Sequence, residues 1–201
     1  IPGSRVAAAK AFHPKYLRNT TDRNGHGTAC AGVACGGTVI DVSAPGPCST
    51  VTPPIGKRFG VAYKADIVVA KVTSPVGSSK ADYVLSGLRW ALCKGANVAS
   101  ISLAMDRDTN ADPGFAQVAE NAFLQGMLIV AAAGNDRPLT VASPASAEHI
   151  PAIGGIDANG ALYRKSCPAG RQPGEEVNLA APAVNVLVPT TDRSPFAPFE
   201  Y

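Results

Sequence analysis

The sequence contains 201 residues, with 18 lysines and arginines against 15 aspartates and glutamates, a formal net charge of +3. These charges are spread along the chain without a basic run, which argues against binding to nucleic acid or to an anionic membrane surface. A chain of this length buries about 70% of the surface that its unfolded form exposes, so we expect one domain with a sizeable core. No apolar stretch reaches the ~20 residues that a membrane span needs. The sequence starts at Ile1 without a signal-peptide pattern, and we expect a mature, processed or truncated product.

The five cysteines are an odd number and lack the CxxC spacing of metal sites. Two of them, Cys48 and Cys167, lie in loop-like stretches and would be able to form a disulfide in a secreted protein. Two others, Cys30 and Cys93, lie in helical patterns and are expected to be buried thiols. A glycosylation sequon at Asn19 is compatible with a secretory route.

A short mixed segment at 5–12 and a polar loop precede the segment NGHGTACAG at residues 24–32. His26 stands there between two glycines, so another group can approach its imidazole closely. The small apolar residues that follow predict a helix with almost no polar face, buried inside the domain. We expect Gly36 and Gly37 to end this helix in left-handed conformations. By itself, the pattern also fits a partly buried histidine at a helix terminus without a catalytic role.

Residues 38–60 are rich in proline, glycine, serine and threonine and predict a long surface insertion. Strands and helices then alternate. A capping-box pattern at 79–82 and a proline after Asp112 mark the two helix starts, while Gly95 and Gly126 mark their ends. The expected strands are 67–72, 98–103, 128–132, 150–156 and 176–180, and the expected helices begin near 81 and 113.

The first three of these strands lack polar alternation and are joined by helices of about twelve residues, which predicts βαβ units and a parallel sheet. Right-handed crossovers place both helices on one face. Reactive groups gather at the carboxyl ends of such strands, here near residues 72, 102–104 and 132–135. At the last of these ends, the amide of Asn135 is able to donate hydrogen bonds to a developing oxyanion. A turn asparagine is the alternative.

Seven short segments occur in one order along the chain, and together they resemble the subtilase (subtilisin-like) serine peptidases from about residue 22 to residue 182. They are NGHGTACAG at 24–32, FGVAYKADIVVAKV at 59–72, ASISLA at 99–104, IVAAAGND at 129–136, SPAS at 143–146, PAIGGID at 151–157 and VNLAAP at 177–182. The resemblance implies an α/β, three-layer subtilisin-like fold, with a mainly parallel sheet covered by helices on both faces and incomplete at both ends. Residues 1–201 would form one partial catalytic domain.

The resemblance also implies a serine-type endopeptidase with His26 as general base and Asn135 as oxyanion donor. An extended segment would pair with the substrate backbone by β-augmentation, and small residues would form the other wall of the first specificity pocket. The segment consists of Ser102, Leu103 and Ala104, and the wall of Ala132, Ala133 and Gly134. Ser143 and Pro144 match a position where the family often has a cis proline. Asp22 matches an acidic residue that is not the triad aspartate.

The family's triad aspartate stands on a strand upstream of the histidine, and its serine stands in a Gly-Thr-Ser-type segment. Neither pattern occurs in these residues. Asp22 lies too close to His26 in sequence to replace the aspartate, and Ser194 lacks small neighbours. We therefore expect a fragment that is inactive alone, or alternatively a pseudopeptidase or peptide-binding module. A metal or redox site on His26, Cys30 and Cys35 is a third, disfavoured hypothesis.

The implied partner is a peptide or protein substrate, and we expect a secreted monomer that binds neither nucleic acid nor membrane. Subtilases commonly bind structural calcium. The sequence contains no dense carboxylate cluster of the kind that calcium requires, so no cofactor is identified and no metal ligand is assigned.

Overall fold

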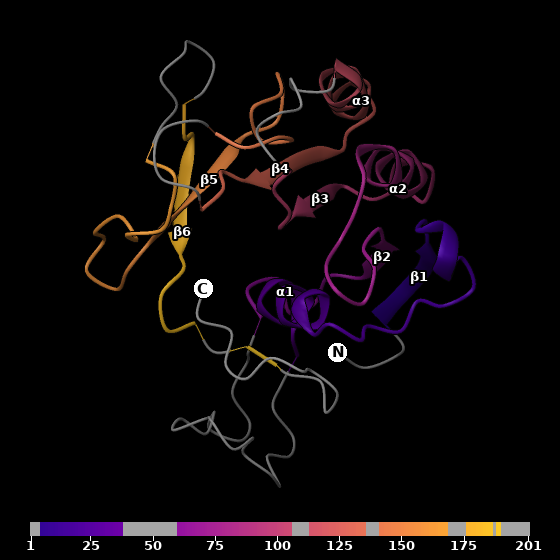
Figure 1. Cartoon of the computed structure of the whole chain (residues 1–201), viewed down its shortest axis with the longest axis horizontal. Coiled ribbons are helices and arrows are strands. Elements are labelled where there is room, and N and C mark those ends of the chain that lie inside the picture. Colours follow the sequence, from indigo (N-terminus) through magenta and orange to yellow (C-terminus); the bar gives the residue numbers. More distant parts are fainter. Residues whose placement is uncertain are drawn as a thin grey trace, which may run out of the picture. The chain divides into compact units, whose positions relative to one another are not determined.

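A computed structural model describes residues 5–37, 60–105, 113–135, 141–168, 176–186, 188 and 189. The contacts between residues divide it into two compact units, one up to Ser79, to which residues 188 and 189 also belong, and one from Lys80 to Val186 (Figure 1). Each unit is built around its own parallel sheet. In this part of the chain, no helix is long and apolar enough to cross a membrane.

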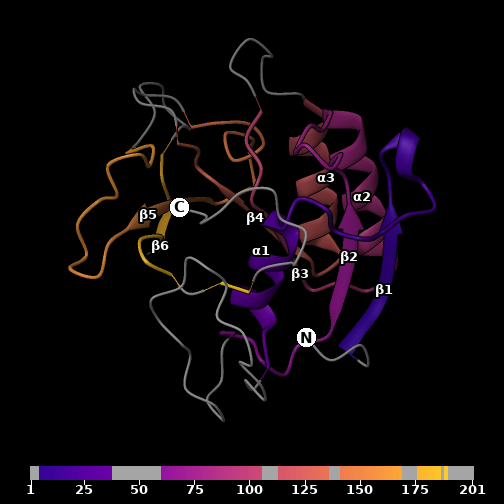
Figure 2. The ribbon, with the colours of Figure 1, turned by 60° about the horizontal axis from the view of Figure 1, so that its bottom comes forward.

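The first unit contains a two-stranded parallel sheet and one long helix. Strand β1 (Val6–Ala11) pairs with β2 (Ile67–Lys71), and a short 3-10 helix, η2 (Pro14–Tyr16), follows β1. The two strands lie side by side in Figure 2. The strand predicted at 67–72 is confirmed, and its last carbonyl, on Lys71, accepts a hydrogen bond from the amide of Phe12 at 2.8 Å.

Helix α1 (His26–Cys35) begins and ends where the sequence predicts. Gly36 follows it with a φ of −55°, so the predicted left-handed ending is wrong. The last turn is capped from outside instead, because the amides of Gly60, Val61 and Ala62 donate to carbonyls of the helix end at 2.7 to 3.1 Å. The Arg5 guanidinium donates to the carbonyl of the last helical residue at 2.8 Å. These bonds satisfy carbonyls that a helix terminus leaves without partners.

The predicted burial of α1 is also wrong. Ala29 and Gly32 are its buried residues, and its other residues are half-buried or exposed. Most of the helix consists of alanine, glycine and cysteine, which are small. Small apolar residues permit burial but expose little apolar area when they stay at the surface, so the pattern does not decide where the helix lies.

The second unit contains two helices, α2 (Ala81–Cys93) and α3 (Pro113–Leu124), and a four-stranded parallel sheet. The strands lie in the order β3 (Val98–Ile101), β4 (Leu128–Ala132), β5 (Ala152–Ile156) and β6 (Leu179–Pro182). Helices α2 and α3 pack against each other, and α3 packs on β4, as right-handed crossovers predict (Figure 1). Phe115, Met127 and Ile129 are among its fully buried side chains. The parallel pairing predicted between the strands at 98–103 and 128–132 is confirmed. The strand predicted at 67–72 pairs with β1 in the first unit and not with β3, because an apolar run predicts a strand without specifying its partner.

Two local predictions fail at element starts. The capping box at 79–82 does not form, because the Ser79 hydroxyl donates to the carbonyl of Val72 at 2.9 Å and α2 has no side-chain cap. The last strand begins three residues later than predicted. Asn178 precedes it, and its side-chain oxygen accepts the amide of Ala152 at 2.7 Å, a position that a backbone carbonyl would otherwise fill.

Gly95 and Gly126 follow α2 and α3 with φ angles of +75° and +85°, so the predicted helix ends are confirmed. Three further predictions fall outside the described residues: the insertion at 38–59, the helix cap at Asp112 and the position of Cys48.

Candidate active site

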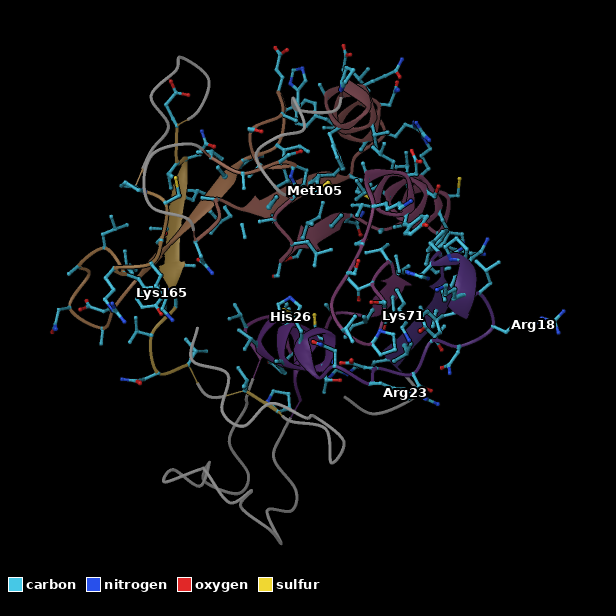
Figure 3. The ribbon with its side chains drawn as sticks, in the orientation of Figure 1. Arg18, Arg23, His26, Lys71, Met105 and Lys165 are labelled. Atoms are coloured by element: carbon cyan, nitrogen blue, oxygen red, sulfur yellow. The ribbon has the colours of Figure 1, made fainter. Side chains whose placement is uncertain are left out.

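His26 is the first residue of α1 and is half-buried (Figure 3). The helix cap before it is Gly25, whose φ of +95° is a conformation that side chains rarely adopt. Gly27 on the other side is exposed. The two glycines therefore leave the imidazole at a helix start with little bulk beside it, as the sequence predicts.

The loop before His26 is organised by the carboxylate of Asp22. One oxygen accepts the amides of Asn24 and Gly25, each at 2.9 Å, and the other accepts the amide and the hydroxyl of Thr28, each at 2.8 Å. Partial burial raises the pKa of Asp22, but the hydrogen bonds from Gly25, Thr28 and Asn24 outweigh it and hold the pKa below its ordinary value. The carboxylate is thus oriented onto the loop and the helix start.

Cys30 lies one helical turn beyond His26, and its sulfur is 3.7 Å from His26 Nε2. Cys35 is the last residue of the helix. Within the described ranges, no group of three histidine, cysteine or acidic side chains lies close enough to hold a metal ion. This arrangement gives the metal hypothesis no support. The predicted burial of Cys30 and Cys93 is wrong, because Cys30 is half-buried on α1 and Cys93, the last residue of α2, is exposed.

In the second unit, Ser102, Leu103 and Ala104 continue from the edge strand β3. Ser102 and Ala104 are exposed and Leu103 is half-buried. Immediately after them comes Met105, which Figure 3 labels. It forms an antiparallel bridge with Ser143, and its amide donates to the Ser143 carbonyl at 2.9 Å. The segment therefore lies between the end of the edge strand β3 and the bridge at Met105, a place where a peptide strand is able to pair with the backbone.

The residues predicted to form the facing wall lie at the carboxyl end of β4. Ala133 is buried, and its carbonyl accepts the amide of Ala142 at 2.9 Å. Gly134 has a φ of +102°, and a Cβ there would lie 3.0 Å from the Ala142 Cβ. Asn135 follows and is exposed, whereas Ala132 before them is half-buried.

Residues 142 and 143 connect these two segments, because Ala142 bonds to the β4 end and Ser143 to Met105. The peptide bond between Ser143 and Pro144 is cis, which confirms that prediction. The Ser143 hydroxyl is buried, and within the described residues it has no hydrogen-bond partner. The structure thus brings Ser102, Leu103 and Ala104 together with the β4 end at one edge of the sheet. His26 belongs to the first unit.

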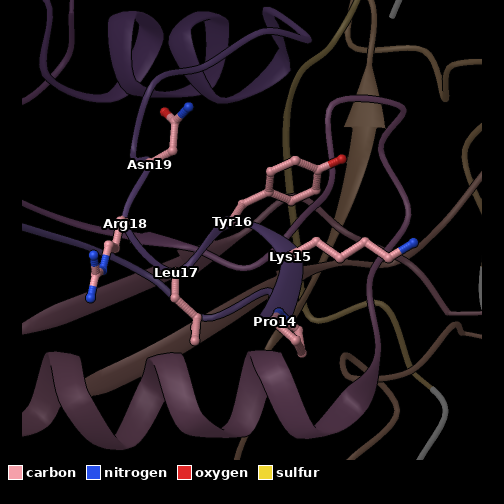
Figure 4. Close-up of a pocket in the computed structure, with 6 residues that line it drawn as sticks. All are labelled: Pro14, Lys15, Tyr16, Leu17, Arg18 and Asn19. Carbon is pink, nitrogen blue, oxygen red and sulfur yellow. The ribbon is translucent and has the colours of Figure 1, made fainter.

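Sequence reasoning missed the roles of Asp22, Gly60 and Ala142. The spacing of Asp22 and Asn24 is a local signal, since short polar side chains bond to backbone amides two or three residues on. Gly60 and Ala142 act on residues distant in sequence, and no local pattern marks them. A surface pocket of about 420 Å³ beside η2 is lined by six consecutive residues, none of which is a predicted site residue (Figure 4).

Several known proteins are similar to this chain over most of its length. The profile described as the Subtilase family matches residues 7–196. A cuticle-degrading serine protease of Orbilia oligospora is 31% identical over 174 residues, which are 85% of this chain and 34% of that protein. Subtilisin Savinase of Lederbergia lenta is 30% identical over 185 residues, 92% of this chain and 60% of that protein.

The solved structure of Sphericase superposes with a TM-score of 0.70 at 24% identity, covering 90% of this chain and 60% of that one. The chain thus spans between about a third and three fifths of the length of these proteins. Together with the two parallel sheets and their helices, this likeness confirms the predicted subtilisin-like α/β fold. The match over residues 7–196 extends through both units, and the chain belongs to the subtilase family.

Proposed function

We propose that the chain is part of a serine-type endopeptidase that hydrolyses peptide bonds by acyl transfer. The observation that supports this most strongly lies in the second sheet, where residues 142 and 143 connect the segment at 102–104, which follows the edge strand, to the end of β4, which exposed Asn135 follows. A peptide strand and an oxyanion donor are needed side by side for this chemistry.

In this proposal, His26 accepts the proton of the attacking serine hydroxyl and later donates it to the leaving amine. Asn135 donates a hydrogen bond to the oxyanion of the tetrahedral intermediate. Ser102, Leu103 and Ala104 pair with the substrate backbone. Ala132, Ala133 and Gly134 line the first specificity pocket, where their small size leaves room for a substrate side chain.

We further propose that the triad aspartate and serine come from sequence beyond these residues, which hold neither an aspartate of the required pattern upstream of His26 nor a Gly-Thr-Ser segment. Residues 1–201 would then be one partial catalytic domain with a surface insertion at 38–60. In subtilisin, losing the serine lowers kcat by about 2 × 10⁶. The isolated chain should accordingly lack measurable turnover.

The decisive experiment is to read the coding sequence on both sides of this chain and to express the extended product. We expect an Asp-Thr-Gly or Asp-Ser-Gly strand upstream, a Gly-Thr-Ser segment downstream, and hydrolysis of a fluorogenic peptide by the extended protein but not by the 201-residue chain. Extended sequence without either pattern would overturn the proposal.

The alternative is a pseudopeptidase or peptide-binding module, which the absence of two triad residues from this sequence favours. It is distinguished by fluorescence anisotropy with a labelled peptide. Binding without hydrolysis by the extended product would support it, while hydrolysis would exclude it.

We also propose a secreted monomer that acts on peptides or proteins, supported by the sequon at Asn19 and by the family. Light scattering tests the monomer, and secretion from the native host tests the location. Structural calcium remains a proposal from the family resemblance alone. A thermal unfolding midpoint that is the same in calcium and in chelator would contradict it.

A further inference from the structure

At the start of α1, the side chains of Asp22 and Asn24 accept hydrogen bonds from backbone amides around His26, and we call this set of contacts the Asp22 frame. The proposed chemistry does not use it. We propose that Asp22 is a positioning residue for His26, which fixes the place of the imidazole by holding the backbone on both sides of it. This inference rests on the proposed role of His26 as the general base. It assigns Asp22 no part in proton transfer.

The Asp22 frame supplies the side-chain hydrogen-bond acceptors that the helix cap lacks. Gly25 occupies the cap position and has no side chain, although the first amides of a helix need acceptors. Asp22 accepts the amide of Thr28, two residues after His26, and the amides of Asn24 and Gly25 just before it. The Asn24 side-chain oxygen accepts the amide of His26 itself at 3.4 Å. Two side chains therefore hold four amides in a five-residue window around the imidazole.

This frame is anchored to other parts of the first unit. The Lys71 ammonium, at the end of β2, donates to the carbonyl of Thr21 at 2.6 Å. The side-chain nitrogen of Asn24, Nδ2, donates to the carbonyl of Pro75 at 3.2 Å. The loop before His26 is thus fixed at Thr21 and at Asn24, and movement of the helix start would break bonds to β2 and to the turn after it.

The geometry also explains why Asp22 acts on the backbone rather than on the imidazole. Its two oxygens accept four hydrogen bonds from Asn24, Gly25 and Thr28, which match the lone pairs of a carboxylate. The negative charge lies at the amino end of α1, where the helix dipole stabilises it. Burial lowers the pKa of Lys71, and the nearby charge of Asp22 opposes this change, so the ammonium that anchors the loop is itself supported by the carboxylate.

The test uses the 201-residue chain and needs no catalysis. The sequence has three histidines, so an imidazole-labelled sample gives three NMR signals, with His13 and His149 as internal references. In Asp22→Asn, an NH₂ group, which is a donor, replaces the oxygen that accepts hydrogen bonds from the amide and the hydroxyl of Thr28. We expect the His26 signal to shift and broaden while the two references stay unchanged. The matched control is Asp66→Asn, which removes the same charge from an exposed residue.

Asp22→Ala should enlarge the His26 change, because it removes all four bonds. Should that variant fail to fold, all three signals would move to unfolded positions, and Asp22→Asn then carries the test. An unmoved His26 signal in Asp22→Asn, or an equal change in Asp66→Asn, would overturn the inference.

A second measurement separates positioning from general stabilisation. In the extended peptidase, with active sites counted by a covalent serine probe, Asp22→Asn should lower kcat by about 10- to 100-fold and leave KM unchanged. Equal kcat in the variant and the parent would count against positioning. If the extended product hydrolyses no peptide, the proposed function fails, whereas the NMR result on the frame stands independently.

Discussion

The replacement of Gly60 by alanine tests how α1 is terminated. A Cβ at this position would lie 2.1 Å from the amide nitrogen of Gly36 and 2.7 Å from the carbonyl carbon of Cys35, and both are backbone atoms that cannot rotate away. The segment at 60–62 must therefore move off the helix end. That movement breaks the three bonds that its amides donate, two to carbonyls in the last turn of α1 and one to the carbonyl of Gly36.

Each lost hydrogen bond costs about 1 kcal/mol net, and more where the carbonyl stays away from water, so we expect Gly60→Ala to lower the free energy of unfolding by about 3 to 5 kcal/mol. With a urea dependence of about 2 kcal/mol per molar, the unfolding midpoint falls by about 1.5 to 2.5 M. Circular dichroism during urea titration measures it.

The matched control is Gly95→Ala. Gly95 also has a special backbone, with a φ of +75°, but an added Cβ there meets nothing within 4 Å. Its cost is the left-handed conformation alone, about 1 to 2 kcal/mol. If both variants show the same midpoint, the close approach of residue 60 to the helix end does not exist and the account of the α1 terminus is wrong.

Three further predictions concern the candidate site. Since the pKa of folded Asp22 is lowered from 3.8, its stabilising contribution is complete above that value and is lost as the pH falls through the lower folded value; acid unfolding curves should show this loss in the parent chain and not in Asp22→Asn. Gly134→Ala should lower the free energy of unfolding by about 2 kcal/mol, because of the positive φ at this position and the contact of the new Cβ with Ala142. Ala142→Gly in the same chain should remove the steric part of this loss, which a double-mutant cycle of urea midpoints measures, and additive effects would contradict the contact. Asn135→Ala in the extended peptidase should lower kcat by about 10² to 10³ with an unchanged unfolding midpoint, because this side chain is exposed; an unaffected kcat in peptide hydrolysis would remove Asn135 from the oxyanion hole.

The sequence predicts an element correctly where apolar residues form a regular pattern, or where a residue type strongly favours one conformation, as glycine does at a left-handed helix end. The strands at 67–71 and 128–132 and the left-handed glycines after α2 and α3 are of this kind. The errors occur where a distant partner decides. Ser79 has the residue type of a helix cap, yet its hydroxyl bonds to the carbonyl of Val72. Asn178 lies within the predicted strand, yet its side-chain oxygen, rather than a backbone carbonyl, accepts the amide of Ala152.

The same distinction applies to the candidate site. Ordered motifs identify His26, Asn135 and the residues at the two strand ends without any knowledge of contacts. They do not reveal what holds those residues, because Gly134 contacts Ala142, which lies outside the motif at 129–136, and the Asp22 frame replaces a cap that Gly25 cannot supply. A glycine beside the histidine keeps the imidazole accessible, and the cost is a helix start without its own cap. The carboxylate three residues earlier offsets that cost, so accessibility and fixed position are achieved by different residues of one short segment.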